Sequence, residues 1–171
     1  MIFSDESRVE IGTDNRLYVW RWAGEEWMPQ CTASPPRTKF GVMLWGCLTF
    51  NGVGTLAFID GNINAKKYEE ILEDNLWPVV ARHFPQENYI FQDDNAPVHR
   101  ARSVMEYRCS NRITTLSWPA QSPDLNIIEN VWHMIKRELQ HDVGNITSVT
   151  DLKTAIRRIW ENLPVDYVQN L

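Results

Sequence analysis

The residues from 40 to 59 carry the strongest local constraint on how this chain folds. Two apolar and partly β-branched runs, Phe40–Phe50 and Thr55–Ile59, flank the segment Asn51-Gly52-Val53-Gly54. Apolar runs around an Asn-Gly pair predict an antiparallel hairpin, because both residues accept the backbone angles of a tight turn. Two neighbouring strands are therefore expected here.

Further strands and helices are expected on either side of this hairpin. An apolar run at Ile2–Asp5 predicts a strand before it, and the runs Tyr89–Gln92 and Ile113–Trp118 predict two strands after it. With the helices described next, the order is three strands, a helix, a strand, a helix, a strand and two helices. This order predicts an α/β fold with a mixed five-stranded sheet flanked by helices.

Four stretches space their apolar residues as helices do. The first begins at Ala65, with Pro78 expected to kink or restart it, and the second covers residues 99–109. The last begins after an N-cap at Thr147 or Ser148. The third is the clearest, because one apolar stripe repeats every three or four residues. This stripe consists of Ile128, Val131, Trp132, Ile135 and Leu139.

Length and composition limit the class of protein. A chain of 171 residues that is 43% hydrophobic predicts one folded domain over residues 1–171. No apolar run approaches the roughly 20 residues that span a bilayer, so no membrane partner is expected. The three cysteines form no Cys-x-x-Cys pair, which argues against a zinc site. A net charge of −5 argues against a surface that is basic throughout.

Three carboxylates stand at the ends of predicted elements. Asp5 ends the first strand, Asp94 follows the fourth, and Glu129 lies in the first turn of the clearest helix. Ligand sites in open α/β sheets gather at strand ends, and Mg²⁺ prefers oxygen ligands. Phosphoryl transfer on DNA commonly uses two such ions. Two Asp and one Glu suffice to hold them.

Each carboxylate also has a purely structural interpretation. Asp5 could be a solvated strand end, and Asp93-Asp94-Asn95 could be turn residues that bond to the backbone. Asn126 followed by Glu129 three residues later resembles a capping box at a helix N-terminus. Residue chemistry leaves these alternatives open, and it does not choose between Asp93 and Asp94.

Short sequence words, in order along essentially the whole chain, carry a resemblance. They are Ser4-Asp5-Glu6-Ser7, Val19-Trp20-Arg21, Val42-Met43-Leu44-Trp45-Gly46-Cys47, Ile59-Asp60-Gly61, Phe91-Gln92-Asp93-Asp94-Asn95-Ala96-Pro97-Val98-His99, Trp118-Pro119-Ala120-Gln121-Ser122-Pro123-Asp124-Leu125-Asn126 and Ile128-Glu129-Asn130-Val131-Trp132. This set closely resembles the catalytic domain of the Tc-one/mariner superfamily of DNA transposases. The 34 residues between Asp94 and Glu129 match its Tc-one-like branch, which ends in Glu.

The resemblance implies a ribonuclease-H-like fold and a cut-and-paste reaction on DNA in the nucleus. It implies that Asp5, Asp94 and Glu129 form the catalytic, metal-binding Asp-Asp-Glu triad for Mg²⁺ or Mn²⁺, with two ions. It selects Asp94 over Asp93 because the family's Asp directly precedes Asn-Ala-Pro. The partners that it implies are transposon terminal repeats and target DNA.

The resemblance also gives an expectation for the segment from about residue 12 to 39. This segment matches the position of the family's clamp loop, which reaches the other subunit of a homodimer, although its three Trp could equally pack on their own domain. The paired helix-turn-helix region that the family uses to recognise transposon ends is expected to be absent from this chain. One departure is Ile127, where the family usually has Pro, and a looser helix entry is expected there.

Other residues near the triad are weaker candidates. Asn95, His99 and Asn126 are possible second-shell or DNA contacts, although a histidine in the place of His99 more often packs or caps a turn.

Three functions are compatible with the sequence. The first is hydrolysis at transposon ends followed by strand transfer of the 3′-hydroxyl into target DNA. The second is a domesticated, inactive module for DNA binding or dimerisation. The third, a ribonuclease-H-type nuclease or an integrase, does not predict the segment Trp118–Asn126.

Overall fold

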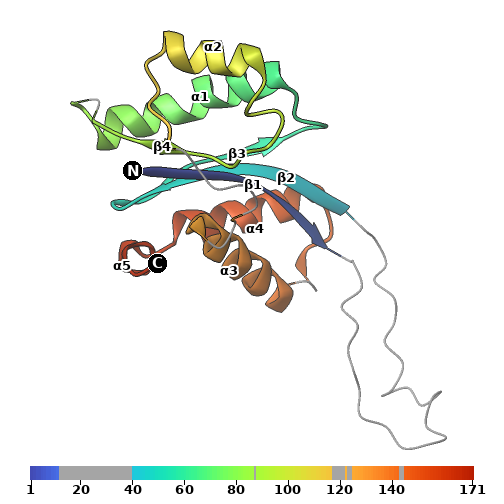
Figure 1. Ribbon diagram of the computed structural model, residues 1–171. Coiled ribbons are helices and arrows are strands. Elements are labelled where there is room, and N and C mark those ends of the chain that lie inside the picture. Colours follow the sequence, from blue (N-terminus) through green and yellow to red (C-terminus); the bar gives the residue numbers. More distant parts are fainter. Residues whose placement is uncertain (12–39, 87, 117–121, 123–124, 143–144) are drawn as a thin grey trace, which may run out of the picture.

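A computed structural model describes residues 1–11, 40–86, 88–116, 122, 125–142 and 145–171. A sheet lies between two helical layers, and the two chain ends lie at the same end of the molecule (Figure 1). The strands are β1 (Ile2–Ile11), β2 (Phe40–Thr49), β3 (Gly52–Ile59) and β4 (Phe91–Gln92). The helices are α1 (Ala65–His83), α2 (Arg102–Ser110), α3 (Ile128–His141), α4 (Val149–Glu161) and α5 (Val165–Gln169).

The strand order is β3-β2-β1-β4, and the sheet is mixed. β1 pairs antiparallel with β2 along its whole length, from Ile2 opposite Thr49 to Ile11 opposite Phe40. β4 pairs parallel with β1 through two residue pairs only, of which Phe3 opposite Gln92 is the last. The short strand β4 is therefore joined to the sheet through β1, which β2 holds along its whole length.

Two strand predictions were wrong in extent. The first strand does not end at Asp5 but continues to Ile11, because Ser7, Val9 and Ile11 are buried in alternation with exposed Arg8 and Glu10. Asp5 consequently lies inside the strand and not at its exit.

The predicted fifth strand is also not formed over the described residues. Residues 113–116 make a single parallel bridge, Phe91 to Thr115, and residues 117 and 118 lie outside the described part. Since β4 has only two residues, it offers a ladder too short for a longer partner. The described sheet therefore has four strands instead of five.

The hairpin is confirmed but is tighter than expected. β2 ends at Thr49, which pairs with Gly52, so most of the predicted loop belongs to β3. Gly52 has a φ of 117°, which only glycine adopts without strain. The register of the β2–β3 pairing shifts between Gly46 and Leu48, as it does at a β-bulge.

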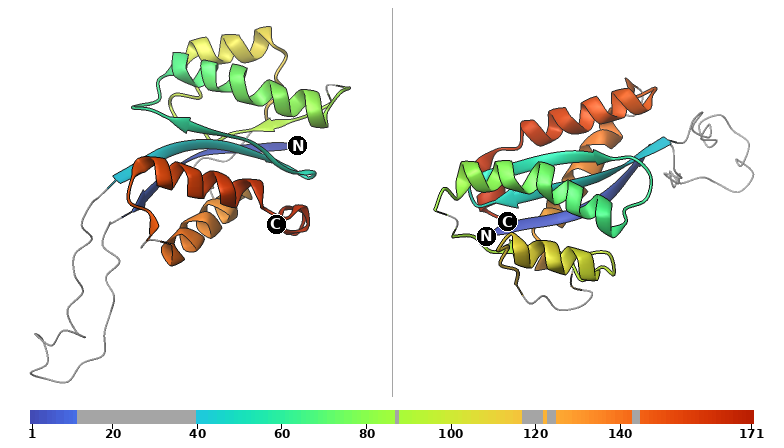
Figure 2. Two further views of the ribbon diagram at one scale, coloured as in Figure 1. Left: turned by 180° about the vertical axis from the view of Figure 1, so that it is seen from behind. Right: turned by 90° about the horizontal axis from the view of Figure 1, so that it is seen from above.

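The two faces of the sheet are covered by different helices. Helices α1 and α2 cover one face, and α3, α4 and α5 cover the other (Figures 1 and 2). Each layer encloses its own buried cluster of apolar side chains. Successive residues of β1 point to opposite faces, so this strand contributes to both clusters: Ile2 to the α1 side, and Val9 and Ile11 to the α3 side.

The helices follow the sequence patterns closely. Pro78 lies inside α1 without ending it, because the helix is held to the sheet by a buried stripe on both sides of the proline. All five residues predicted for the stripe of α3 are buried. Ser148 caps α4 by accepting a hydrogen bond from the Asp151 N–H at 3.0 Å. The second helix begins later than predicted, at Arg102, after hydrogen-bonded turns over residues 96–101.

Gly46 on β2 makes room for two stacked indole rings. The rings of Trp132 and Trp160 lie 5.4 Å apart, and a Cβ atom at Gly46 would stand 2.8 and 2.9 Å from their outer carbons. We expect Gly46→Ala to lower the free energy of unfolding by about 1–3 kcal/mol, the usual cost of overpacking a core. Urea denaturation of the two proteins measures this, and an unchanged midpoint would contradict it.

The expected clamp loop, residues 12–39, lies outside the described residues. In the described part of the chain, no helix combines the length and apolar character needed to cross a membrane.

Candidate active site

Two neighbouring acidic residues of β1 face opposite layers of the protein. The indole Nε1 of Trp132, on α3, donates a hydrogen bond of 2.9 Å to Oδ2 of Asp5. The Oε1 atom of Glu6 lies 3.3 Å from Nε2 of His99, on the α1–α2 side. The pleat of one strand therefore presents one carboxylate to α3 and the next to the other layer.

Asp5 shares its face with Glu129, in the first turn of α3. Burial, followed by the negative charges of Glu129 and Glu6, raises the pKa of Asp5 to about 8, although the bond from Trp132 opposes this rise. Burial and the neighbouring carboxylates both disfavour the charged form of this carboxyl group. A cation bound here would relieve that repulsion.

The capping-box interpretation of Glu129 was wrong. The N-cap of α3 is Ile127, which makes no side-chain capping hydrogen bond. The side-chain Nδ2 of Asn126 instead donates a hydrogen bond of 3.0 Å to the Ser4 carbonyl of β1. Asn126 is buried, and its Oδ1 lies 3.5 Å from the N–H of Ile128. This asparagine ties the start of α3 to the strand that carries Asp5.

Asp94 follows β4 in the chain. The ladder between β1 and β4 ends with Phe3 opposite Gln92, so Asp94 lies two residues beyond the last pair. Oδ1 of Asp94 accepts a hydrogen bond from the Ala96 N–H at 2.8 Å. A bond from His99, together with this one, holds the pKa of Asp94 below its usual range even against partial burial.

Asp93 has a different environment from Asp94, which separates the two adjacent candidates. The Asp93 side chain is buried, accepts a 2.8 Å hydrogen bond from the Tyr68 hydroxyl and pairs with the Arg108 guanidinium. Burial raises its pKa, against the opposing charges of Arg108 and His99. The Asp94 side chain is 51% exposed, so it is the one that a ligand can reach.

His99 is buried at the junction of these carboxylates. Its Nδ1 lies 2.6 Å from Oδ1 of Asp94 and 3.7 Å from Oδ2 of Asp93. Its ring stacks on Tyr68 with 4.1 Å between centroids. Burial lowers the pKa of His99, but the hydrogen bonds to Asp94 and Glu6 and the nearby negative charges outweigh it and raise the pKa to about 10.

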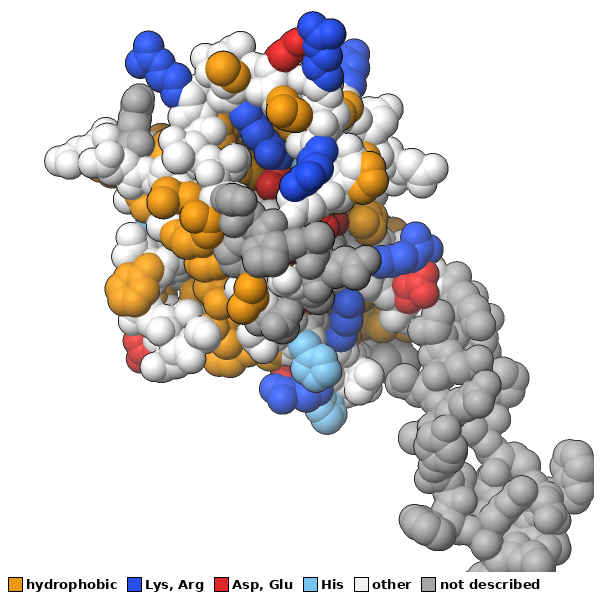
Figure 3. All heavy atoms as spheres, viewed as in Figure 1, with side chains coloured by type: hydrophobic (Ala, Val, Ile, Leu, Met, Phe, Trp, Pro, Cys, Tyr) orange, Lys and Arg blue, Asp and Glu red, His pale blue; other side chains and the backbone are white. Residues whose placement is uncertain are grey.

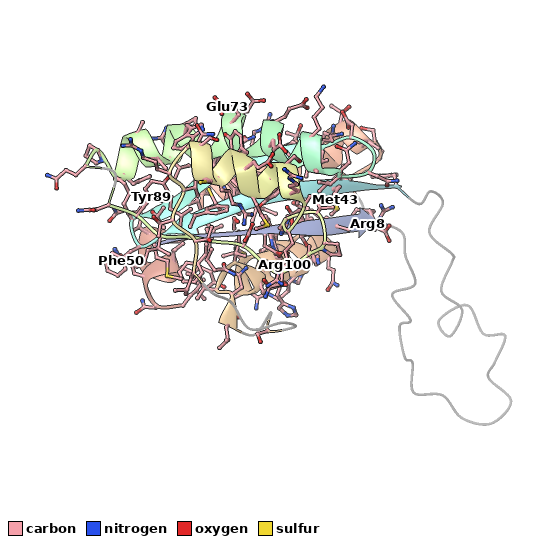
Figure 4. The ribbon with its side chains drawn as sticks, turned by 45° about the horizontal axis from the view of Figure 1, so that its top comes forward. Arg8, Met43, Phe50, Glu73, Tyr89 and Arg100 are labelled. Atoms are coloured by element: carbon pink, nitrogen blue, oxygen red, sulfur yellow. The ribbon has the colours of Figure 1, made fainter. Side chains whose placement is uncertain are left out.

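The side chain of Asn95 contacts Arg100 at the protein surface. Its Oδ1 accepts hydrogen bonds from the Arg100 guanidinium at 2.6 and 3.1 Å. Arg100, labelled in Figure 4, belongs to the segment between β4 and α2. The sequence did not indicate this pair, nor the roles of Glu6, Tyr68, Arg108 and Trp132 around the carboxylates.

The donor set suits a hard divalent cation in its chemistry. Within the described ranges, no three His, Cys, Asp or Glu side chains are gathered as ligands for a single ion. Asp5 and Glu129 nevertheless interact electrostatically, whereas Asp94 lies beyond the paired part of β4 and contacts His99. Asp5 and Asp94 each have one oxygen engaged by a protein donor, and carboxylate oxygens are what Mg²⁺ and Mn²⁺ prefer.

The chain resembles known proteins over nearly its whole length. A model of the family described as DDE superfamily endonuclease matches residues 1–153. The chain is 36% identical to the transposable element Tcb1 transposase of Caenorhabditis briggsae over 175 residues, covering 99% of this chain and 62% of the relative. It is 33% identical to the Tc3 transposase of Caenorhabditis elegans, covering 100% of this chain and 51% of the relative. The chain thus spans between half and two thirds of these relatives.

Solved structures show the same fold. The Mos1 transposase paired-end complex with the left transposon end superposes with a TM-score of 0.80 at 22% identity, over 99% of this chain and 50% of that one. The mariner Mos1 paired-end complex with Mg gives 0.79 at 21% identity, over the same shares. This likeness confirms the expected ribonuclease-H-like fold, with a mixed sheet flanked by helices.

Proposed function

The chain belongs to the DDE superfamily endonuclease family, within the Tc-one/mariner transposases, and from that premise we propose that residues 1–171 are the catalytic domain of a cut-and-paste DNA transposase. The proposed activity is hydrolysis of the phosphodiester at transposon ends, followed by strand transfer of the freed 3′-hydroxyl into target DNA. The observation that carries the proposal is the electrostatic interaction of Asp5 with Glu129 on the α3 side of the sheet.

Three carboxylates have distinct roles in this proposal. Asp5, from the middle of β1, and Glu129, from the start of α3, would hold divalent cations on the α3 side of the sheet. Asp94, from the loop after β4, would complete the set. Two Mg²⁺ or Mn²⁺ ions bound there would supply a nucleophilic water and charge stabilisation for the attacking and leaving oxygens. Structures of the Mos1 relative with Mn and with Mg support this choice of ion.

Other residues of the chain keep these carboxylates in place. Trp132 donates to Oδ2 of Asp5 and so fixes the orientation of that side chain. Asn126 joins α3 to β1 through the Ser4 carbonyl, which holds Glu129 near Asp5. No covalent bond between protein and DNA is needed, because water and the 3′-hydroxyl are the attacking groups.

The proposed partners are DNA and a second copy of the chain. A Mos1 relative is solved as a paired-end complex with a transposon end, which supports transposon terminal repeats as the DNA partner. On the face shown in Figure 3, described Lys and Arg side chains are spread over both helical layers without forming a single basic stripe. With a net charge of −5, we infer that sequence recognition depends on a helix-turn-helix region outside these residues. Dimerisation through residues 12–39 and a nuclear location complete the proposal.

Removal of the metal tests this function. We expect the natural full-length chain to cut a duplex that carries its terminal repeats in Mg²⁺, and to lose cutting in excess EDTA. Adding Mn²⁺ beyond the EDTA should restore it, because either ion suits carboxylate ligands. A gel assay with end-labelled DNA measures both strands.

A duplex with scrambled repeats serves as the control. Cutting that persists in EDTA would contradict the proposal. Tight, repeat-specific binding without cutting in either ion would support the domesticated binding module instead.

A further inference from the structure

His99 lies between Glu6 of β1 and two acidic residues, Asp93 and Asp94, of the loop after β4. Its two ring nitrogens contact Oδ1 of Asp94 at 2.6 Å and Oε1 of Glu6 at 3.3 Å, and only 3% of its side chain is exposed. We propose that His99 is a positioning residue that fixes Asp94 for metal binding and is itself held by Glu6. This inference rests on the proposed function, since it takes Asp94 as a metal ligand.

Asp94 needs such support because its strand gives it little. β4 ends at Gln92, so Asp94 lies two residues beyond the last ladder pair, and half of its side chain is exposed. The Ala96 N–H and His99 both bond to Oδ1 of Asp94. These contacts fix the carboxylate and leave Oδ2 for a cation.

His99 can act as a support because it is itself tightly held. Its ring stacks on Tyr68, whose hydroxyl donates to Asp93, and Asp93 pairs with Arg108 of α2. All of these side chains lie on the α1–α2 side of the sheet. The support for Asp94 therefore comes from the α1–α2 layer, whereas Glu129 belongs to α3 on the other side of the sheet.

Through Glu6, strand β1 helps to position both of the proposed metal ligands Asp5 and Asp94. Asp5 is placed by the strand directly, and its neighbour Glu6 reaches His99 on the other face. Through His99, the position of Asp94 is then set relative to the same strand. This explains an otherwise unassigned acidic residue that contacts a buried histidine 93 residues away in sequence.

Two substitutions of His99 separate positioning from packing. In His99→Asn, the amide nitrogen takes the place of Nδ1 and can still donate to Asp94. In His99→Gln, which is closer to histidine in size, the amide nitrogen takes the place of Nε2 and reaches Glu6 instead. Mn²⁺ binding to the protein is measured by electron paramagnetic resonance of the free ion, and the thermal midpoint is recorded for each variant.

We expect His99→Gln to raise the Kd for Mn²⁺ by about tenfold or more, as is typical for loss of a residue that orients a metal ligand. His99→Asn should stay within about threefold of wild type because the bond to Asp94 is kept. His141→Ala, at the exposed end of α3, is the matched histidine control and should leave Mn²⁺ binding unchanged.

The remaining outcomes overturn the inference in distinguishable ways. If Asp94→Ala weakens Mn²⁺ binding but His99→Gln does not, the positioning role is wrong and the proposed metal site stands. If Asn and Gln variants are equally impaired or reversed in order, His99 acts through packing. If Asp94→Ala leaves binding unchanged, both the inference and the proposed site fail. Should His99→Gln not fold, Glu6→Gln replaces it, with a smaller loss of Mn²⁺ affinity expected and an unchanged affinity overturning the inference.

Discussion

Asp94→Asn is expected to reduce DNA cutting by more than about 100-fold, beyond the loss typical of residues that only orient a ligand. The amide cannot supply the negative charge that a divalent cation requires, whereas its size and its acceptor for the Ala96 N–H are retained. The side chain is half exposed, so the thermal midpoint should change little. Cleavage of an end-labelled terminal-repeat duplex in Mg²⁺ measures the effect.

Asp5→Asn should give a loss of similar size, because the Asp5 carboxylate interacts electrostatically with Glu129 and is proposed to hold the cation together with it. Asp74→Asn, at an exposed position of α1, is the matched control and should cut like wild type. Normal cutting by Asp94→Asn would remove this residue from the triad.

The neighbouring substitution, Asp93→Asn, is expected to act on stability instead. Asp93 and Arg108 form an ion pair with 8% and 13% of their side chains exposed. Removing the carboxylate leaves the guanidinium buried without its counter-charge, and this typically costs about 3–5 kcal/mol. Urea denaturation followed by tryptophan fluorescence measures the loss.

A double variant provides the control for this prediction. Asp93→Asn combined with Arg108→Met removes both charges, so the double variant should be more stable than Asp93→Asn alone. If Asp93→Asn unfolds at the wild-type urea concentration, the ion pair contributes nothing. The expected contrast is that one Asp of the adjacent pair serves chemistry and the other serves the fold.

Elements with a clear periodic pattern could be predicted from the sequence. The stripe of α3 is visible because Ile128, Val131 and Trp132 recur at helical spacing, and the hairpin is visible from Asn51-Gly52. The full length of β1 was missed because Glu6, Arg8 and Glu10 interrupt its apolar residues. Their charge hides the alternation by which buried Ser7, Val9 and Ile11 take turns with exposed Arg8 and Glu10 in the second half of the strand.

The sequence nominates candidate carboxylates, but it does not reveal their surroundings. The resemblance selected Asp94, whereas the reason for the choice, the burial of Asp93 against Tyr68 and Arg108, is a tertiary contact. The bond from Trp132 to Asp5 joins residues 127 positions apart, so no local pattern reveals it. Trp132 was therefore expected to serve the core alone.

The unequal lengths of the two ladders of β1 have a consequence for heating. Ten residue pairs hold β1 to β2, but only two hold β4 to β1. Amide hydrogens of β4 and the loop after it should exchange with solvent through small local openings, long before the β1–β2 arm opens. Asp94 would then leave its place while Asp5 keeps its own. Catalysis should consequently fail at temperatures where most of the protein is still folded.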